Sequence, residues 1–198
     1  MEYEDERYSM TPQDPEAPQR VARLNELGLG NGPVPEFDDF ARELAESTGA
    51  PYAMVNLIGE EHQYFAGLHT PGQDNGVDGP AAAQEAAGTG GTEPGRVMDR
   101  DHGYCPHVVV RKKALVLEDV CDYPRFAGNP VVDEIGIRSY LGAPLVDHTG
   151  TTIGTICVVD VEPRPWGRPG LEKIKNMAAE MTERLRAREQ QRSENAGE

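Results

Sequence analysis

Two apolar runs late in the chain are separated by only four residues and therefore predict a β-hairpin. The first run is residues 138–146 (RSYLGAPLV) and the second is residues 151–160 (TTIGTICVVD). The four residues between them end in Gly150, and a short turn that contains glycine favours antiparallel pairing of its flanking strands. Gly142 and Gly154 lie inside these runs, where a missing side chain permits a bulge or a close backbone approach. We therefore expect an antiparallel sheet at the centre of the fold.

Further strands are predicted earlier in the chain. Residues 52–58 (YAMVNLI) form a short apolar run bounded by Pro51 and Gly59, and residues 63–68 follow after a few polar residues, which indicates a second hairpin. Residues 114–119 (ALVLED) predict one more strand. The sheet should thus contain five to six strands.

Two helices are expected to flank this sheet. Apolar residues recur on one helical face from Glu36 onward, before Gly49 and Pro51 stop the helix: Phe37, Phe40, Ala41, Leu44 and Ala45. A longer helix is predicted from Pro169 to Arg188, with an apolar stripe at steps of three and four: Leu171, Ile174, Ala178, Met181 and Leu185. The stripe either packs on its own sheet or leaves a seam for a homodimer. Helices and an antiparallel sheet together predict the α+β class.

The composition along the chain sets the expected domain limits. Residues 1–18 are acidic and interrupted by proline, so they cannot bury enough apolar surface to order, and we expect them to be disordered. Residues 70–95 are rich in Gly, Ala, Pro and Thr and are expected to form a flexible insertion. Residues 191–198 predict a second disordered tail. Between these two tails we expect a single folded domain over residues 19–190, with the insertion inside it.

Charge and cysteine content exclude several classes of protein. A formal net charge of -15 repels phosphate backbones, so we expect no nucleic-acid binding. No apolar run approaches the roughly 20 residues that span a bilayer, so no membrane insertion is expected. The acidic start lacks the pattern of a signal peptide. Three cysteines without a CxxC spacing suit a reducing compartment, and the expected location is cytoplasmic.

Four motifs together resemble the GAF domain family over residues 20–188. They are GYCPHVV at 103–109, LVLEDVCDYPRFAGNPVV at 115–132, IRSYLGAPL at 137–145 and GTTIGTICVVDVEPRPW at 150–166. The resemblance implies a GAF-like, PAS-related twisted antiparallel sheet with flanking N- and C-terminal helices. It also implies a pocket between the sheet and residues 104–132, where GAF domains bind cyclic nucleotides, tetrapyrroles, haem or small metabolites.

The residues that we expect to contact such a ligand come from both sides of this pocket: Phe65, Tyr104, Cys105, His107, Asp119, Phe126 and Tyr140. The sequence does not identify the ligand. The resemblance implies a sensory function, and because no kinase, phosphatase, cyclase or DNA-binding module is found on the chain, any output is expected to pass through another protein. A bound small molecule would order the segments around Tyr104 and residues 122–132, and the terminal helix would pass this change to a partner protein.

Two alternatives depend on the cysteines and histidines. Cys105 and His107 could supply half of a tetrahedral metal site, with Cys121 or His102 completing it, and a histidine here could also ligate haem. The GAF fold also supports free methionine sulfoxide reductase, whose chemistry needs a nucleophilic and a resolving cysteine. Cys157 is expected to be a small core residue. A protein-interaction module with a vestigial pocket is the third alternative, and we expect no catalytic residues because HExxH, GxSxG and phosphate-loop motifs do not occur.

Overall fold

A computed structural model describes residues 11–71 and 95–197. The predicted tail at 1–10, most of the predicted insertion at 70–95 and residue 198 lie outside these ranges. The helices are α1 (Ala17–Leu27), α2 (Pro35–Thr48), α4 (Cys105–Arg111), α5 (Pro124–Ala127), α6 (Pro130–Ile135) and α7 (Gly167–Asn195), with a 3-10 turn η3 (Val120–Asp122). The strands are β1 (Tyr52–Ile58), β2 (His62–His69), β3 (Val97–Asp99), β4 (Leu115–Leu117), β5 (Ser139–Val146) and β6 (Thr152–Asp160).

The six strands form one antiparallel sheet in the order β3-β2-β1-β6-β5-β4. Both predicted hairpins, β1–β2 and β5–β6, are confirmed, and their inner strands pair with each other at the centre. Gly154 in β6 lies so close to the carbonyl of Asn56 in β1 that no Cβ would fit between them. The expectation of a close backbone approach at this glycine is therefore correct.

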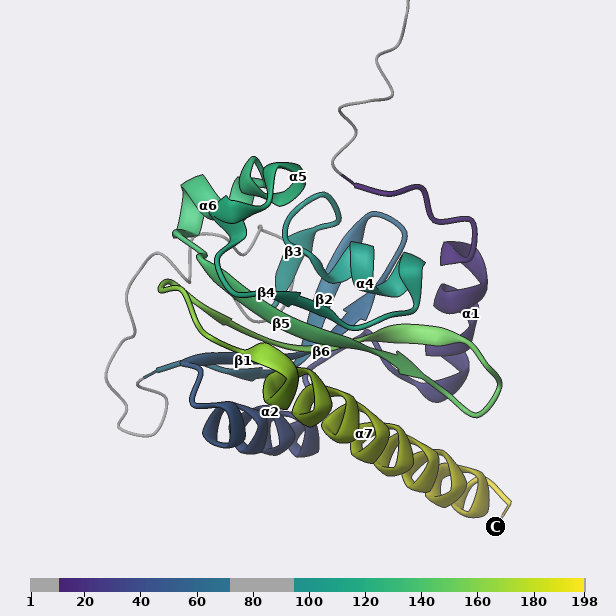
Figure 1. Cartoon of the computed structure of the whole chain (residues 1–198). Coiled ribbons are helices and arrows are strands. Elements are labelled where there is room, and N and C mark those ends of the chain that lie inside the picture. Colours follow the sequence, from purple (N-terminus) through teal and green to yellow (C-terminus); the bar gives the residue numbers. More distant parts are fainter. Residues whose placement is uncertain (1–10, 72–94, 198) are drawn as a thin grey trace, which may run out of the picture.

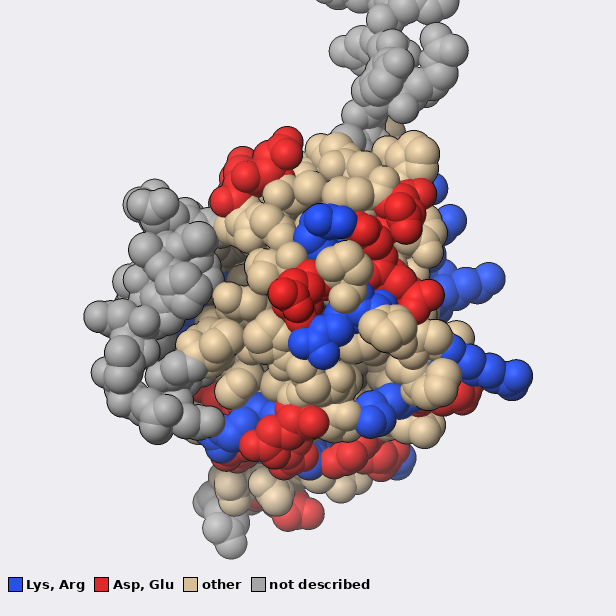
Figure 2. Space-filling model, turned by 60° about the vertical axis from the view of Figure 1, so that its left-hand side comes forward, with Lys and Arg blue, Asp and Glu red and all other residues tan. Residues whose placement is uncertain are grey.

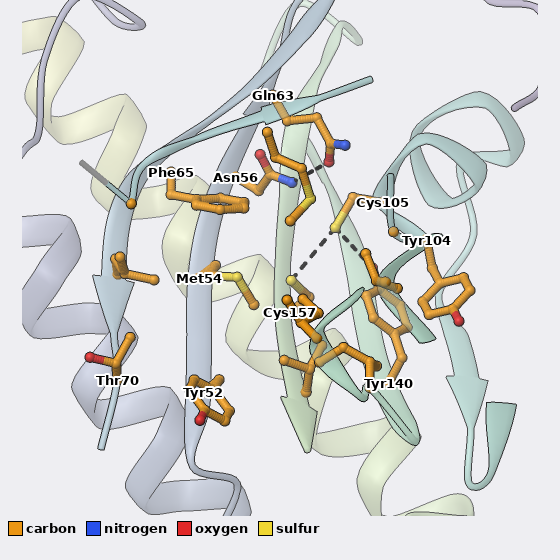
Figure 3. Close-up of a pocket in the computed structure, with 18 of the residues that line it drawn as sticks. Tyr52, Met54, Asn56, Gln63, Phe65, Thr70, Tyr104, Cys105, Tyr140 and Cys157 are labelled. Atoms are coloured by element: carbon orange, nitrogen blue, oxygen red, sulfur yellow. Dashed lines mark hydrogen bonds between the residues drawn. The ribbon is translucent and has the colours of Figure 1, made fainter. Parts of the chain in front are cut away.

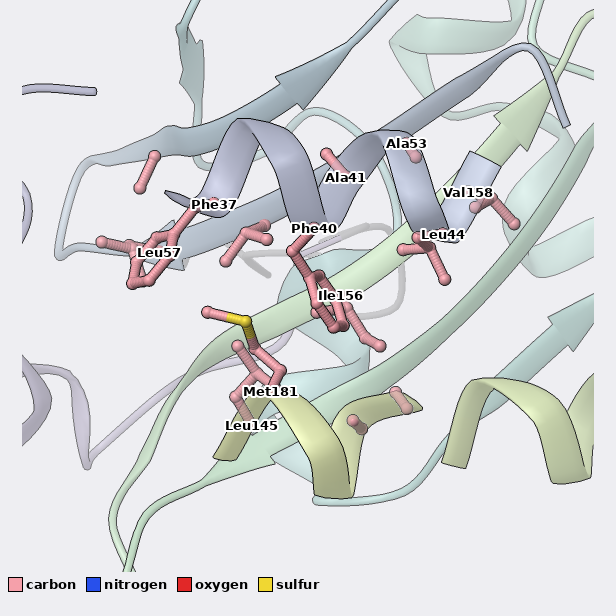
Figure 4. Packing of buried hydrophobic residues seen from close by; sticks show 14 of the residues in the cluster. Phe37, Phe40, Ala41, Leu44, Ala53, Leu57, Leu145, Ile156, Val158 and Met181 are labelled. Atoms are coloured by element: carbon pink, nitrogen blue, oxygen red, sulfur yellow. The ribbon is translucent and has the colours of Figure 1, made fainter. Parts of the chain in front are cut away.

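The first face of the sheet is covered by α2 and α7, which lie side by side beneath the strands in Figure 1. Figure 4 shows Phe40 and Leu44 of α2 and Met181 of α7 directed toward the sheet. These three side chains are 0% exposed. Burying one large apolar side chain stabilises a fold by about 1.5–3 kcal/mol, so this layer holds the helices against the strands.

The opposite face of the sheet carries the short helices α4, α5 and α6 above the strands (Figure 1). A second apolar cluster lies here, separate from the first, and it includes Val108 of α4, Phe126 of α5 and Tyr140 of β5. The molecule therefore has three layers, with the sheet in the middle. The α+β class and the helices flanking the sheet agree with the sequence prediction.

The N-terminal boundary differs from the prediction. Helix α1 begins at Ala17, and Arg20, with 1% of its surface exposed, donates hydrogen bonds to the carboxylate of Asp14 and the carbonyl of Thr152. Residues 14–18 are therefore part of the folded domain, where disorder was expected. The acidic composition favoured disorder, but the buried ion pair between Arg20 and Asp14 and the hydrogen bond from Arg20 to Thr152, much later in the chain, outweigh it.

The C-terminal helix is also longer than predicted. Helix α7 continues beyond Arg188 to Asn195, so residues 191–195 are helical. Glu189 accepts hydrogen bonds from Arg23 of α1 and from His148 in the β5–β6 turn, which ties the last turns of α7 to the domain. Good helix formers in this stretch support the extension.

The apolar stripe of α7 is used within the monomer. Ile174, Ala178, Met181 and Leu185 are buried in the core cluster, and Leu171 is half-buried. The four buried side chains favour packing on the chain's own sheet, the first of the two expected uses of the stripe, and a homodimer contact through this helix stays a prediction. Helical spacing alone could not distinguish the two uses of the stripe.

Charged side chains of both signs are interspersed over the face shown in Figure 2. Many of the basic side chains are paired with acidic ones, as in Arg96 with Asp38 and Arg138 with Asp119. The described residues on this face therefore present no continuous basic surface. None of the helices within the described ranges is both long and apolar enough to cross a membrane.

Candidate ligand pocket

A cavity of about 310 Å³ lies on the face of the sheet opposite α2 and α7. Its floor is formed by alternate residues of the strands, such as Tyr52, Met54 and Asn56 of β1, because side chains two apart point to the same face. Residues 103–105 and the end of α6 form the opposite wall. The cavity thus lies where the sequence predicted a pocket, between the sheet and residues 104–132 (Figure 3).

Asn129 holds the two parts of that wall together. Its side-chain oxygen accepts hydrogen bonds from the amides of Gly103 and Val131, and its side-chain nitrogen donates to the carbonyl of Gly103. The side chain is buried, so these bonds are shielded from water. The segment that carries Tyr104 and Cys105 is thereby fixed to the start of α6.

Most of the pocket wall is apolar. Carbon and sulfur atoms line it from both the sheet and the covering segments: Met54, Phe65, Leu68, Met98, Val131, Ile135, Ile137, Val159 and Val161, with the rings of Tyr52, Tyr104 and Tyr140. The Tyr104 hydroxyl donates to the carbonyl of Phe126, so this residue contributes only its ring to the wall. Such a surface favours an apolar or aromatic ligand.

One end of the pocket is polar. The Nδ2 of Asn56 donates to the Oε1 of Gln63 at 2.8 Å, and the Nε2 of Gln63 donates to the carbonyls of Asp99 and His102. The Oδ1 of Asn56 is buried and has no hydrogen-bond partner among the described residues. A buried acceptor without a partner costs about 1–3 kcal/mol, so a donor on a ligand would be favoured here.

Two thiols meet where the covering wall reaches the floor of the pocket, Cys105 from the wall and Cys157 from β6. The Sγ of Cys105 lies 3.5 Å from the Sγ of Cys157 and 3.2 Å from the hydroxyl oxygen of Tyr140, as Figure 3 shows. Burial opposes ionisation of Cys105, but hydrogen bonds, the strongest with the Cys157 thiol, outweigh this effect and lower the pKa of Cys105 to about 6. The same contact and burial raise the pKa of Cys157, and burial also raises the pKa of Tyr140.

Four of the seven residues predicted to contact a ligand line the pocket: Phe65, Tyr104, Cys105 and Tyr140. The other three lie elsewhere. His107 of α4 packs edge-on against Phe126 of α5, with ring centroids 5.1 Å apart. Both side chains are buried between these two helices and not in the pocket wall. Asp119 caps η3 and forms two hydrogen bonds with Arg138.

Several pocket residues were missed by the sequence prediction. Of these, Asn56 could have been found from the sequence, because it is a single polar side chain within the apolar run of β1. Cys157 is buried as expected, yet it also faces the pocket and contacts Cys105. Cys121, by contrast, is exposed on η3. No local pattern in the sequence indicates which two of the three cysteines meet.

The metal site considered for Cys105 and His107 is not assembled. Within the described ranges, one group of three or more potential ligands is close enough to share an ion, and it consists of Asp99, Asp101 and His102. Its two carboxylates are exposed, and His102 lies 2.6 Å from Asp101 and 3.1 Å from Glu134, which occupies both ring nitrogens. Exposed acidic groups of this kind are common without a metal, and we assign no function to this group.

Comparison with known proteins identifies the family. Residues 34–184 match the sequence model of the GAF domain, which is more than half of the chain. The chain belongs to the GAF domain family. This GAF chain is also 28% identical over 147 residues to a protein named cyclic di-GMP phosphodiesterase from Pseudomonas aeruginosa. The match covers 73% of this chain but spans only 21% of the length of that relative.

Solved structures share the GAF fold. The free methionine-R-sulfoxide reductase of Neisseria meningitidis, solved with its substrate, superposes with a TM-score of 0.57 at 15% identity over 91% of this chain and 96% of that one. The GAF domain of an Acinetobacter phosphoenolpyruvate-protein phosphotransferase gives 0.53 at 12% identity over 94% of this chain and 100% of that one. At such identities these likenesses establish the fold alone.

Proposed function

We propose that this GAF domain is a sensory module that binds a small molecule in the pocket above the sheet. The observation that carries the proposal is the combination of an apolar cavity of about 310 Å³ with one unpaired buried acceptor, Asn56 Oδ1. The volume lies at the lower end of the roughly 300–1,000 Å³ typical of ligand pockets. The ligand is therefore a small, mainly apolar or aromatic molecule with one hydrogen-bond donor.

The route from the pocket to α7 passes through β5 and β6. Tyr140 and Cys157 face the pocket, whereas their strand neighbours Leu141 and Val158 belong to the cluster that packs on α7. Because alternate residues of a strand point to opposite faces, a shift of either strand changes both surfaces. A ligand that binds one arrangement of these strands more tightly biases the position of α7, which then acts on a partner protein.

Native mass spectrometry of the untagged protein, with an absorption spectrum, tests for a ligand retained on purification. A thermal-shift screen of small aromatic and heterocyclic metabolites follows. Met54→Trp fills the pocket and should abolish both retention and thermal shift, whereas Met54→Leu conserves the volume and should keep them. Equal binding by wild type and Met54→Trp would refute ligand binding in this cavity.

A reductase is the second candidate, and the contact between Cys105 and Cys157 in the pocket favours it. The structural relative from Neisseria meningitidis carries the name of free methionine-R-sulfoxide reductase. The test is the reduction of free methionine sulfoxide with dithiothreitol as electron donor. Turnover that Cys105→Ser abolishes would support this candidate, and its absence in the wild type would eliminate it.

A further inference from the structure

We propose that Cys105 and Cys157 are a hydroperoxide-reactive dithiol that closes reversibly to a disulfide between the covering wall and the floor of the pocket. This modification site needs no bound ligand, so it stands independently of the proposed sensory function. It would connect the first residue of α4 to the middle of β6. The covering layer and the sheet would then be linked covalently at the point where they enclose the pocket.

The two sulfurs lie close together, and the cavity gives access to them. They are separated by 3.5 Å, and a disulfide bond of about 2.05 Å requires them to approach by roughly 1.5 Å. Cys105 begins a short helix that follows the glycine at Gly103, whereas Cys157 is held by β1 and β5 on either side. Because β6 is paired on both sides, we expect the approach to come from the covering segment rather than from the sheet. Both side chains line the cavity, which a molecule as small as hydrogen peroxide can enter.

Cys105 is the attacking residue. The Tyr140 hydroxyl, 3.2 Å away, can donate a hydrogen bond to a thiolate at this position. The Cys105 thiol itself donates to Cys157, and once Cys105 is ionised the Cys157 thiol becomes the second donor. These two donors stabilise the anion, consistent with the lowered pKa of Cys105. Cys157 keeps its proton under the same conditions, because its pKa is raised. The two cysteines thus have different roles before any oxidant arrives.

The reaction balances with a hydroperoxide as the only oxidant. The Cys105 thiolate attacks the terminal oxygen of ROOH, the O–O bond breaks, and the departing alkoxide takes the proton that the thiol released, which leaves a sulfenic acid and ROH. The sulfur of Cys157 then attacks the sulfenic sulfur, the S–O bond breaks, and the hydroxide leaves as water with the Cys157 proton. Two thiols and one hydroperoxide give one disulfide, one ROH and one water. A dithiol reductant restores the starting state.

Cys121 provides a matched control because it is exposed and lies on η3, outside the pocket. Wild type and Cys121→Ser are treated with hydrogen peroxide and analysed by intact-mass spectrometry and peptide mapping. We expect both to lose the mass of two hydrogen atoms, to yield a peptide that links Cys105 to Cys157, and to recover with dithiothreitol. This measurement needs no substitution in the core, so it does not depend on the folding of a pocket variant.

Trapping of the intermediate assigns the order of the two cysteines. Two variants are made in the Cys121→Ser background. With Cys157→Ser the sulfenic acid cannot be resolved, so dimedone should label Cys105, and with Cys105→Ser the remaining Cys157 should stay unlabelled at neutral pH. The proposal is overturned if the linkage involves Cys121, if no linkage forms in Cys121→Ser, or if Cys157 reacts equally fast without Cys105. This reaction requires no bound ligand, so its failure would leave the ligand-binding proposal intact.

Discussion

The ring of Tyr140 covers the Cα of Gly142, two positions farther along β5, so that a Cβ at 142 would collide with the Tyr140 ring and hydroxyl. This packing holds the hydroxyl 3.2 Å from the Sγ of Cys105. A glycine that the sequence alone marks as a site of close approach therefore serves the pocket. Its missing side chain makes room for the aromatic ring that contacts the thiol pair.

Gly142→Ala should displace the Tyr140 ring. Because both residues are buried in the same layer, overpacking should lower the free energy of unfolding by about 1–3 kcal/mol. Urea denaturation followed by circular dichroism measures this change. Gly32→Ala is the matched control, since open space surrounds Gly32, and it should leave the unfolding midpoint unchanged. Equal midpoints for the two variants would contradict the packing described here.

Tyr140→Phe removes the hydroxyl and keeps the ring. The thiolate of Cys105 then loses one hydrogen bond, so the pKa of Cys105 should rise by about one unit from its value near 6. The pH dependence of alkylation by iodoacetamide, read from the Cys105 peptide, measures this pKa. Tyr52→Phe removes a hydroxyl from the same pocket at a distance from the thiols (Figure 3) and should not change the profile. An unchanged profile in Tyr140→Phe would show that the phenol does not stabilise the thiolate.

Asp147 makes the stability of the domain sensitive to acid. Partial burial would raise its pKa, but hydrogen bonds from Thr149 and Arg23 outweigh this and hold the pKa below its ordinary value of 3.8. A carboxyl group whose pKa is lower in the folded state contributes stability that is fully present above the unfolded pKa and is lost as the pH falls through the folded one. The contact between α1 and the β5–β6 turn should therefore weaken below about pH 4.

Asp147→Asn should remove this part of the acid dependence. Urea midpoints measured from neutral pH down to about pH 3 should fall less steeply in the variant than in the wild type. Some slope will remain, because Arg20 also lowers the pKa of Asp14 against the opposing effect of burial. Glu172→Gln, on the exposed surface of α7, serves as the control. A wild-type slope in Asp147→Asn would mean that this carboxylate does not contribute.

The sequence predicts those parts of the fold that depend on local pattern. The apolar runs of β1, β5 and β6 and the turn residues that bound them predict the centre of the sheet, whereas the three-residue strand β3 is too short to form such a run. Helix α1 was missed because it is held by Arg20, which pairs with Asp14 and donates a hydrogen bond to Thr152 of β6, 132 residues later in the chain. The pocket residues divide in the same way. Those near Tyr104 were predicted from a local motif, whereas the pairing of Cys105 with Cys157 depends on a contact between residues 52 positions apart.

The apolar stripe of α7 gives a prediction that separates its two alternative uses. Met181 is 0% exposed and packs in the core with Phe40, Leu145 and Ile156 (Figure 4). Met181→Ala should lower the free energy of unfolding by about 2–5 kcal/mol, because it leaves a cavity between α7 and the sheet. Glu183→Ala, on the exposed side of the same helix, should change it by less than about 0.5 kcal/mol.

Sedimentation velocity on the same variants distinguishes the two uses of the stripe. If Met181 stabilises its own sheet, the oligomeric state of Met181→Ala matches that of the wild type while its unfolding midpoint falls. If the stripe were a seam between subunits, the sedimentation coefficient would drop toward that of a smaller species, and the unfolding midpoint would depend on protein concentration. The burial of four of the five stripe residues within one chain leads us to expect the first result.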